Sequence, residues 1–233
     1  MSVIGVIHSC FPEKFGIPRQ SGLAPSALAT IELLEPFNRP EMVRGLETFS
    51  HIWVQFLFHQ SRSEGWKATV RPPRMGGKER RGVFATRSPH RPNHIGLSAV
   101  RLLELELSEG GVTIEIGGVD MLDGTPVLDI KPYIPYSDCL SGATSGWLLD
   151  PGEEMEVVFS KKAELFCRVY EQENGRPLTA LIREVLAADP RPASQKGQRS
   201  GFGMSFWDVN VRWRVSGTTC RVESCERLTA TPA

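Results

Sequence analysis

The first 138 residues contain a series of short apolar segments, and glycine or proline interrupts the chain between them. The strongest segment, residues 50–59, carries apolar side chains on both of its faces, which is typical of a central strand. Residues 97–107 and 112–116 also alternate, and Gly110-Gly111 between them is typical of a hairpin turn. Short strands without long helices between them predict a mostly β fold, either a small antiparallel barrel or a sandwich.

The character of the chain changes near residue 137. Residues 139–152 are small, polar and turn-rich, so we expect a linker between a first domain, 1–138, and a second domain, 153–233. The second domain shows both kinds of period: a strand at 154–159, helices at 161–173 and 178–188, one alternating strand at 204–215 and a last strand near 220–224. These patterns predict a smaller α+β domain.

A polar loop follows a short apolar segment in the middle of the first domain. Val83 to Ala85 is predicted as a short strand, after which Pro89 and Pro92 restrict the backbone. The side chains between these breaks are Arg87, His90, Arg91, Asn93 and His94. Guanidinium and amide groups on a stiff loop suit the recognition of phosphate, carboxylate or base edges. The alternative is a surface loop whose arginines are only solvated.

A second polar segment covers residues 117–133. Asp123-Gly124 followed by Pro126 is typical of a turn, so Asp123 either caps this turn or binds a ligand. Asp129 lies inside the short apolar run 127–130, where a carboxylate is costly unless it is paired or functional.

The charge of the chain is unevenly placed. Its formal net charge is zero, but eight lysines and arginines lie between Lys67 and Arg91, with only Glu64 and Glu79 nearby. This asymmetry indicates a basic face for an anionic partner, or else a solvated, salt-bridged surface. The same two alternatives apply to the basic residues of the second domain: Arg183, Arg191, Lys196, Arg199, Arg212 and Arg214.

Several classes of protein are disfavoured by the composition. The five cysteines are odd in number and form no Cys-x-x-Cys pair, which opposes a zinc site or a disulfide framework and suits the cytoplasm. We expect no membrane span and no signal peptide. The spacing of a phosphate-binding P-loop is absent from "RMGGKER", and no Gly-x-Gly-x-x-Gly follows a predicted strand. The sequence therefore argues against a nucleoside triphosphatase and against a Rossmann-type enzyme.

Five segments together carry a resemblance to a known family. They read "EKFGIPRQSGL", "VRGLETFSHIWVQFLFHQ", "GVFATRSPHRPNHIGLS", "VDMLDGTPVLDIKPY" and "IREVLAADPRPASQKG…FWDVNVRWRV". In this order they resemble the TsaA-like family of S-adenosylmethionine-dependent tRNA methyltransferases, and the last segment resembles its longer, bacterial members. The resemblance covers nearly the whole chain. It implies methylation of the exocyclic nitrogen of threonylcarbamoyladenosine, which lies just 3′ of the anticodon, by a small β-barrel that works as a homodimer with the cofactor near the interface.

The resemblance also implies roles for individual residues. Residues expected to hold the cofactor are Gln20, Ser21, Gly22, Phe58, His59, Arg87, Leu97, Asp120, Met121, Leu122, Asp123 and Gly124. Residues expected at the reaction centre are Arg87 and Asn93, with Asp129, Lys131 and Tyr133 beside the substrate base. Arg87 suits the threonyl carboxylate, and Tyr133 suits stacking on the base. If the reaction needs a proton acceptor, His59 and Asp129 are both candidates. His94 departs from the family pattern, in which proline is common, and this predicts a less rigid loop.

The chemistry of this reaction needs neither a metal nor an activated nucleophile, because a sulfonium methyl is already electrophilic. The protein has to align the reacting atoms and exclude water. Two other classes remain open from the sequence. One is a non-catalytic RNA-binding module that has kept the barrel, and the other is a dimeric small-molecule-binding protein without an RNA partner.

Overall fold

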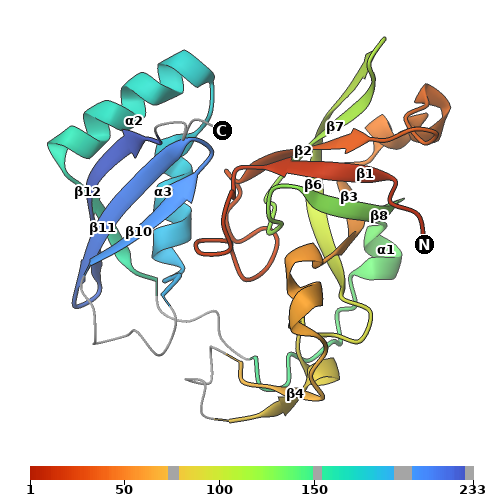
Figure 1. The fold of residues 1–233 in the computed structure, drawn as a ribbon, viewed down its shortest axis with the longest axis horizontal. Coiled ribbons are helices and arrows are strands. Elements are labelled where there is room, and N and C mark those ends of the chain that lie inside the picture. Colours follow the sequence, from red (N-terminus) through yellow and green to blue (C-terminus); the bar gives the residue numbers. More distant parts are fainter. Residues whose placement is uncertain (73–78, 149–153, 192–200, 229–233) are drawn as a thin grey trace.

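The fold is a closed antiparallel barrel joined to a smaller α+β unit, and the computed structural model describes residues 1–72, 79–148, 154–191 and 201–228. Six strands close the barrel in the order β1-β2-β7-β6-β3-β8 (Figure 1). Their bounds are β1 Gly5–Ser9, β2 Leu28–Leu33, β3 His51–Leu57, β6 Ile95–Ser108, β7 Gly111–Gly117 and β8 Thr125–Pro132. The predicted fold class, a mostly β protein with a small antiparallel barrel, is confirmed.

Strand β3 is central, as its two apolar faces predict. It pairs with β6 on one side and with β8 on the other. Ile52, Val54 and Phe56 point into the barrel and are at most 4% exposed. Since side chains alternate along a strand, Trp53 and Gln55 lie on the outer face. The alternation therefore decides which residues of β3 form the core and which form a surface.

The second unit is a four-stranded sheet in the order β10-β11-β12-β9, with two helices packed against it (Figure 1). The elements are β9 Glu156–Phe159, α2 Lys161–Asn174, α3 Leu178–Ala187, β10 Gly201–Phe206, β11 Val209–Ser216 and β12 Thr219–Arg227. Ser160 caps the start of helix α2, because its Oγ accepts a hydrogen bond from the Ala163 backbone, and Gly175, with φ 66°, caps its end. These caps account for the predicted helix bounds.

Two predicted elements are wrong. The predicted single strand at 204–215 is a hairpin, because the chain turns at Trp207, which has φ 49°, and β11 returns beside β10. The alternation of apolar and polar residues continues on both sides of this turn, so the two-residue period of the sequence does not reveal the turn. The predicted strand Val83–Ala85 is a 3₁₀ turn, η5, and the short strand β5 lies before it at Arg81–Gly82, paired with β4 at Thr69–Val70.

Four further short helical turns complete the described elements. They are η1 Pro40–Val43, η2 Leu46–Thr48, η3 His59–Glu64 and α1 Pro135–Asp138. The predicted strand at 50–59 is two residues shorter at its end, because the chain turns into η3 at His59.

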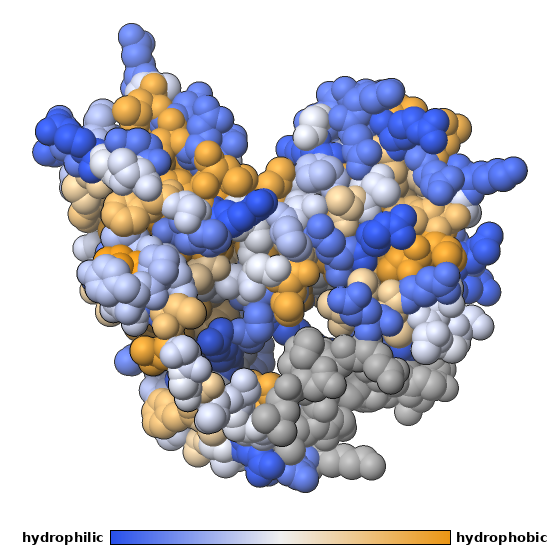
Figure 2. Space-filling model, turned by 180° about the vertical axis from the view of Figure 1, so that it is seen from behind, coloured by the Kyte–Doolittle hydropathy of each residue, from blue (hydrophilic) through white to orange (hydrophobic). Residues whose placement is uncertain are grey.

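The long connection between β1 and β2, residues 10–27, lies between the barrel and the second unit (Figure 1). The Trp207 backbone donates to the Cys10 carbonyl at 2.9 Å. Ser26 donates to the Glu184 carboxylate through both its backbone N–H and its Oγ, each at 2.8 Å. Seen from behind, the two units form two lobes with a notch between them (Figure 2). The connection thus holds the two lobes together.

The predicted domain bounds, 1–138 and 153–233, stay a prediction. The end of the predicted linker 139–152 falls on residues 149–152, outside the described residues. Four basic residues of the two stretches considered above also lie outside the described residues: Arg74, Lys78, Lys196 and Arg199.

Candidate active site

A cavity of about 650 Å³ opens at one end of the barrel. This volume lies within the range that holds a small-molecule ligand. Five segments form its wall: the connection 10–27, the end of β3 with η3, the loop after η5, the start of β6, and residues 120–125. Strand pairing explains why they meet, since β3 lies between β6 and β8 and all of these loops leave the same end of the barrel.

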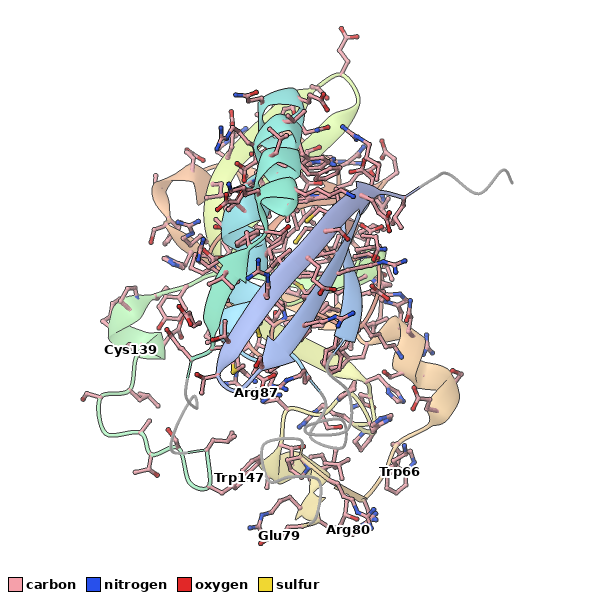
Figure 3. All side chains as sticks on the ribbon, turned by 90° about the vertical axis from the view of Figure 1, so that its left-hand side faces the viewer. Trp66, Glu79, Arg80, Arg87, Cys139 and Trp147 are labelled. Atoms are coloured by element: carbon pink, nitrogen blue, oxygen red, sulfur yellow. The ribbon has the colours of Figure 1, made fainter. Side chains whose placement is uncertain are left out.

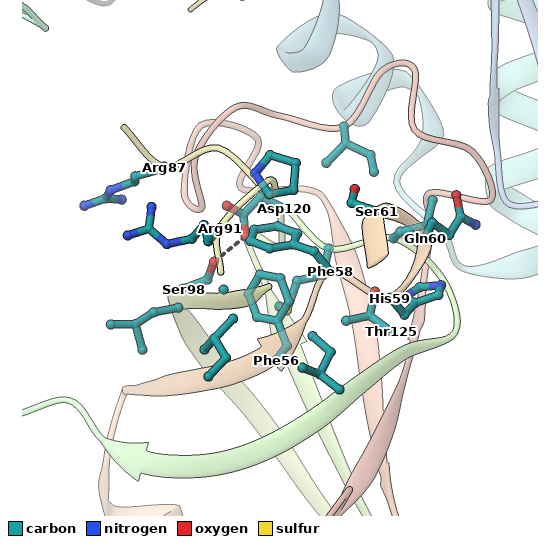
Figure 4. A pocket seen from close by; sticks show the side chains of 18 of the residues that line it. Phe56, Phe58, His59, Gln60, Ser61, Arg87, Arg91, Ser98, Asp120 and Thr125 are labelled. Carbon is teal, nitrogen blue, oxygen red and sulfur yellow. Dashed lines mark hydrogen bonds between the residues drawn. The ribbon is translucent and has the colours of Figure 1, made fainter. Parts of the chain in front are cut away.

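A partly buried carboxylate faces this cavity. Asp120 is partly buried, and Ser98 Oγ donates to its Oδ1 at 2.6 Å (Figure 4). Burial raises the pKa of the Asp120 carboxyl, while the hydrogen bond from Ser98, the charge of Arg87 and the backbone N–H of Ser21 offset part of this rise. A carboxylate with free lone pairs beside a cavity suits a ligand hydroxyl or amine. Ser98 was not predicted as a site residue, although its position next to the predicted Leu97 in "IGLS" could have indicated it.

Two aromatic rings form an apolar wall. Phe56 and Phe58 contact each other edge to face, with ring centroids 5.1 Å apart. Gly96 of β6 pairs with Phe56, and a Cβ at Gly96 would lie 2.3 Å from the Phe56 ring. The ring can therefore occupy its place only because position 96 has no side chain. Phe56 and Gly96 were also missed, since nothing local in the sequence reveals which residues face each other across two strands.

The mouth of the cavity carries two arginines. Arg87 is exposed there and donates to the Gln20 side chain. Arg91 donates to the carbonyls of Thr86 at 2.8 Å and Val83 at 3.3 Å, so it shapes the loop. Figure 4 shows both arginines on the side of Asp120 and Ser98, away from His59. These two arginines thus lie together on one side of the opening, while Lys14 and Arg19 also belong to the cavity lining.

The loop containing His94 is held by three hydrogen bonds. The His94 backbone N–H donates to Arg91, its carbonyl accepts from the Phe58 N–H at 2.8 Å, and its Nδ1 lies 3.0 Å from the Pro89 carbonyl. His94 is buried and has φ 51°, which proline cannot adopt. These bonds hold the loop at this position without a proline, and the expected loss of rigidity stays a prediction.

His59 opens η3 and lines the cavity. Burial lowers the pKa of its imidazole, and the charge of Lys14 acts in the same direction. A neutral imidazole can accept a proton. His59 is thus placed where a proton acceptor could act, whereas Asp129 is not among the residues that line the cavity.

The predicted site residues fall into two groups. Eight of them line the cavity: Gln20, Phe58, His59, Arg87, Leu97, Asp120, Met121 and Leu122. The others lie outside its lining: Ser21, Gly22, Asn93, Asp123, Gly124, Asp129, Lys131 and Tyr133.

Three of the residues outside the lining have structural contacts. Asp123 Oδ1 accepts from the Ser9 backbone at 2.9 Å, and Gly124 donates to the Ile7 carbonyl at 2.8 Å, so this turn is fastened to β1. Gly22 donates to the Gly118 carbonyl at 2.8 Å. Of the two alternatives for Asp123, its described contact favours a structural role.

Asp129, Lys131 and Tyr133 lie on the outer face of the barrel. Asp129 and Lys131 form an ion pair at 3.3 Å, and the Tyr133 ring lies 5.5 Å from the ring of Trp53. Trp53 also lines the cavity and donates to Asp138 at 2.9 Å, which helps to lower the pKa of that carboxyl after the larger effect of the Ile134 backbone N–H. Trp53 therefore joins the outer face of the barrel to the edge of the cavity.

Within the described ranges, no group of three or more His, Cys, Asp and Glu side chains is placed to hold a metal ion. In the same ranges, no helix is both long and apolar enough to cross a membrane. The five cysteines are free thiols, and only Cys139 is exposed.

The closed barrel, with a polar and aromatic cavity at its end, defines a ligand-binding protein whose site is built from barrel loops and not from a Rossmann sheet. Comparison with known proteins identifies it further. The chain belongs to the tRNA-methyltransferase O family, whose N-terminal domain matches residues 6–139 and whose C-terminal domain matches residues 152–228.

Two relatives and one solved structure illustrate this membership. The tRNA (adenine(37)-N6)-methyltransferase of Escherichia coli is 47% identical over 96% of each chain. A putative S-adenosylmethionine-dependent methyltransferase of Pseudomonas aeruginosa is 48% identical over 91% of each chain. The crystal structure of TrmO from Pseudomonas aeruginosa has a TM-score of 0.80 and 41% identity, and the match covers 97% of both chains.

Proposed function

We propose that this protein transfers a methyl group from S-adenosylmethionine to the N6 nitrogen of the adenosine at position 37 of tRNA, when that adenosine carries the threonylcarbamoyl group. The strongest support is the 47% identity to the Escherichia coli tRNA (adenine(37)-N6)-methyltransferase, because it extends over 96% of both chains. Such an enzyme would work in the cytoplasm, where tRNA is modified.

The cavity fits a cofactor of this kind. Asp120 would accept hydrogen bonds from its hydroxyl or amino groups, and the rings of Phe56 and Phe58 would contact its apolar parts. When bound, S-adenosylmethionine supplies an electrophilic methyl carbon on a sulfonium. Gln20, His59, Leu97, Met121 and Leu122 line the same space.

The protein's own part in the reaction is to orient the substrate and exclude water. Arg87, held by Gln20 at the mouth, would bind the threonyl carboxylate, and its planar guanidinium can do so with two parallel hydrogen bonds. Orientation of the two reactants can contribute about 7–11 kcal/mol. His59 is the better placed of the two candidate proton acceptors.

Replacing Arg87 with alanine should lower turnover at least about tenfold, because loss of a charge-assisted pair to a carboxylate costs about 1.5–3 kcal/mol. Affinity for S-adenosylmethionine should change little, since Arg87 lies at the mouth. Steady-state kinetics with modified tRNA and calorimetric titration with the cofactor would measure the two effects. Arg168→Ala, an exposed change on α2, is the control. Unchanged turnover in Arg87→Ala would remove this residue from the site.

The reaction itself is tested by methyl transfer from labelled S-adenosylmethionine into two tRNA pools, one with and one without threonylcarbamoyladenosine. We expect label only in the modified pool. Label in both pools would move the target elsewhere. No label with either pool, together with no affinity for the cofactor, would favour an RNA-binding module that has kept the barrel.

We also propose that the protein is a homodimer in which the outer barrel face of one chain completes the cavity of the other. Asp129, Lys131 and Tyr133 lie on that face, next to Leu97 and Trp53 at the cavity edge, so a second copy could bring them to the substrate base. Light scattering would give the mass. If the site is shared, Arg87→Ala and Tyr133→Ala should each lower the activity, and mixing and refolding the two variant chains should restore part of it. An active monomer would contradict the shared site.

A further inference from the structure

Two large aromatic side chains are exposed in the segment that leads from η3 to β6. Phe84 in η5 is 77% exposed, and Trp66 is 62% exposed. Exposed aromatic residues of this size are typical of binding surfaces. Both belong to a segment outside the barrel that we term the basic arm, residues 66–72 and 79–91, which contains the separate β4–β5 pair.

The turn that carries Phe84 is rigidly held. The Val83 backbone donates to the Ala68 carbonyl at 3.0 Å, and the Trp147 indole donates to the Ala85 carbonyl at 3.2 Å. The Arg91 guanidinium lies 5.7 Å from the centroid of the Phe84 ring, a cation–π distance. The ring is therefore presented to solvent by a backbone that is already ordered, which lowers the entropy cost of binding.

The turn is also continuous with the active site. Thr86, Arg87 and Arg91 line the cavity and follow Phe84 within seven residues. Trp66 is tied to the same loop, because the backbone N–H of Lys67 donates to the His90 carbonyl at 3.1 Å. Figure 3 shows Trp66 and Arg80 at the same end of the molecule, beyond Arg87. A substrate entering the cavity from this side would meet these aromatic side chains first.

The charge around the aromatic side chains indicates what they bind. The described residues between 62 and 91 contain seven lysines and arginines against two glutamates, in a chain whose net charge is zero. A second copy of this surface would be repelled by the same charge. Aromatic rings interleaved with cations are instead the usual means of holding unpaired nucleotides, whose bases stack and whose phosphates pair with Lys and Arg.

We propose that the basic arm is the RNA-reading surface of this enzyme, and that Phe84 stacks on an unpaired base of the anticodon loop next to the nucleotide that enters the cavity. Lys67 and neighbouring cations would pair with the phosphates. The proposal rests on the proposed function, since it takes the same tRNA as the substrate. The proposal adds that Phe84 in the basic arm makes the enzyme bind an open RNA loop in preference to a duplex.

The first test is binding of an anticodon stem-loop RNA by Phe84 variants. Phe84→Ala should weaken binding at least about fivefold, Phe84→Leu should not restore it, and Phe84→Trp should, because stacking requires a ring. Affinity for S-adenosylmethionine and the mass by light scattering should stay unchanged. Leu165→Ala on α2, which also removes an exposed apolar side chain, should bind RNA as the wild type does.

The second test separates stacking from charge. Lys67→Ala should lower the slope of log affinity against log salt by about one, whereas Phe84→Ala should leave the slope unchanged. A blunt RNA duplex of the same length should not distinguish Phe84→Ala from the wild type. Wild-type affinity for the stem-loop in Phe84→Ala, full rescue by leucine, or a change of mass would overturn the proposal.

These binding measurements do not depend on catalysis. If the wild-type enzyme transfers no methyl group to tRNA, the proposed reaction fails, but the effect of Phe84 on RNA binding can still be read. If methyl transfer is confirmed and Phe84→Ala keeps the wild-type KM for tRNA, the reaction stands and the role of Phe84 fails.

Discussion

Replacing Gly96 with alanine should destabilise the barrel and disrupt the cavity together. The new Cβ would lie 2.3 Å from one atom of the Phe56 ring and 2.4 Å from a second, so the ring must move. Overpacking of a core costs about 1–3 kcal/mol, and we expect Tm to fall by about 5 °C or more. Because Phe56 is part of the cavity wall, affinity for S-adenosylmethionine should fall at least about tenfold. Calorimetric unfolding and cofactor titration would measure the two effects.

Two further variants make this prediction specific. Gly201→Ala adds the same methyl group in β10, where nothing lies within 4 Å, and should leave Tm and activity unchanged. The double change Gly96→Ala with Phe56→Leu should recover stability but not cofactor affinity, since the smaller side chain relieves the overlap and leaves the wall incomplete. Wild-type Tm in Gly96→Ala alone would show that the ring relocates at no cost.

Replacing Asp120 with asparagine should separate binding from stability. The amide keeps the shape of the side chain but loses the negative charge, so affinity for S-adenosylmethionine should fall about 10- to 100-fold, the loss of one charge-assisted hydrogen bond. Stability at neutral pH should be maintained or increased, because the buried charge is costly in the folded state. Glu115→Gln, an exposed change on β7, is the matched control.

The pH dependence of stability tests the same carboxyl. Burial raises the pKa of Asp120 above its unfolded value of about 3.9, so between these two values the folded state binds more protons than the unfolded state. This group alone therefore makes stability fall as pH rises through that window, and Asp120→Asn should remove this fall. Denaturant unfolding of both proteins from pH 3 to 8 would show a difference that grows with pH. A pH-independent difference would mean that Asp120 does not titrate in this window.

Local patterns in the sequence were sufficient for the class of fold. The two apolar faces of residues 50–59 predict a central strand, and Gly110-Gly111 predicts the hairpin between β6 and β7. Both predictions are confirmed. Local sequence was sufficient for them, because apolar patterning and turn conformation depend on residues close together along the chain. The same local signal misassigned residues 204–215, since an alternating pattern continues through the turn at Trp207.

The candidate site divides in the same way. Asp120, Arg87, Phe58 and His59 were predicted and line one cavity. The sequence could not show that Ser98 hydrogen-bonds Asp120, or that Gly96 makes room for Phe56, because both contacts join separate segments.

The sequence by itself determined the alternation, the turns and the concentration of positive charge in the basic arm, since these depend on residue type and local spacing. Only the tertiary structure decided the register between β3 and β6, the placement of Asp129, Lys131 and Tyr133 on the outer face, and the exposure of Phe84. Strand register and loop packing are set by the summed contacts of many distant residues, and a shift of one residue would turn every side chain of a strand to the opposite face.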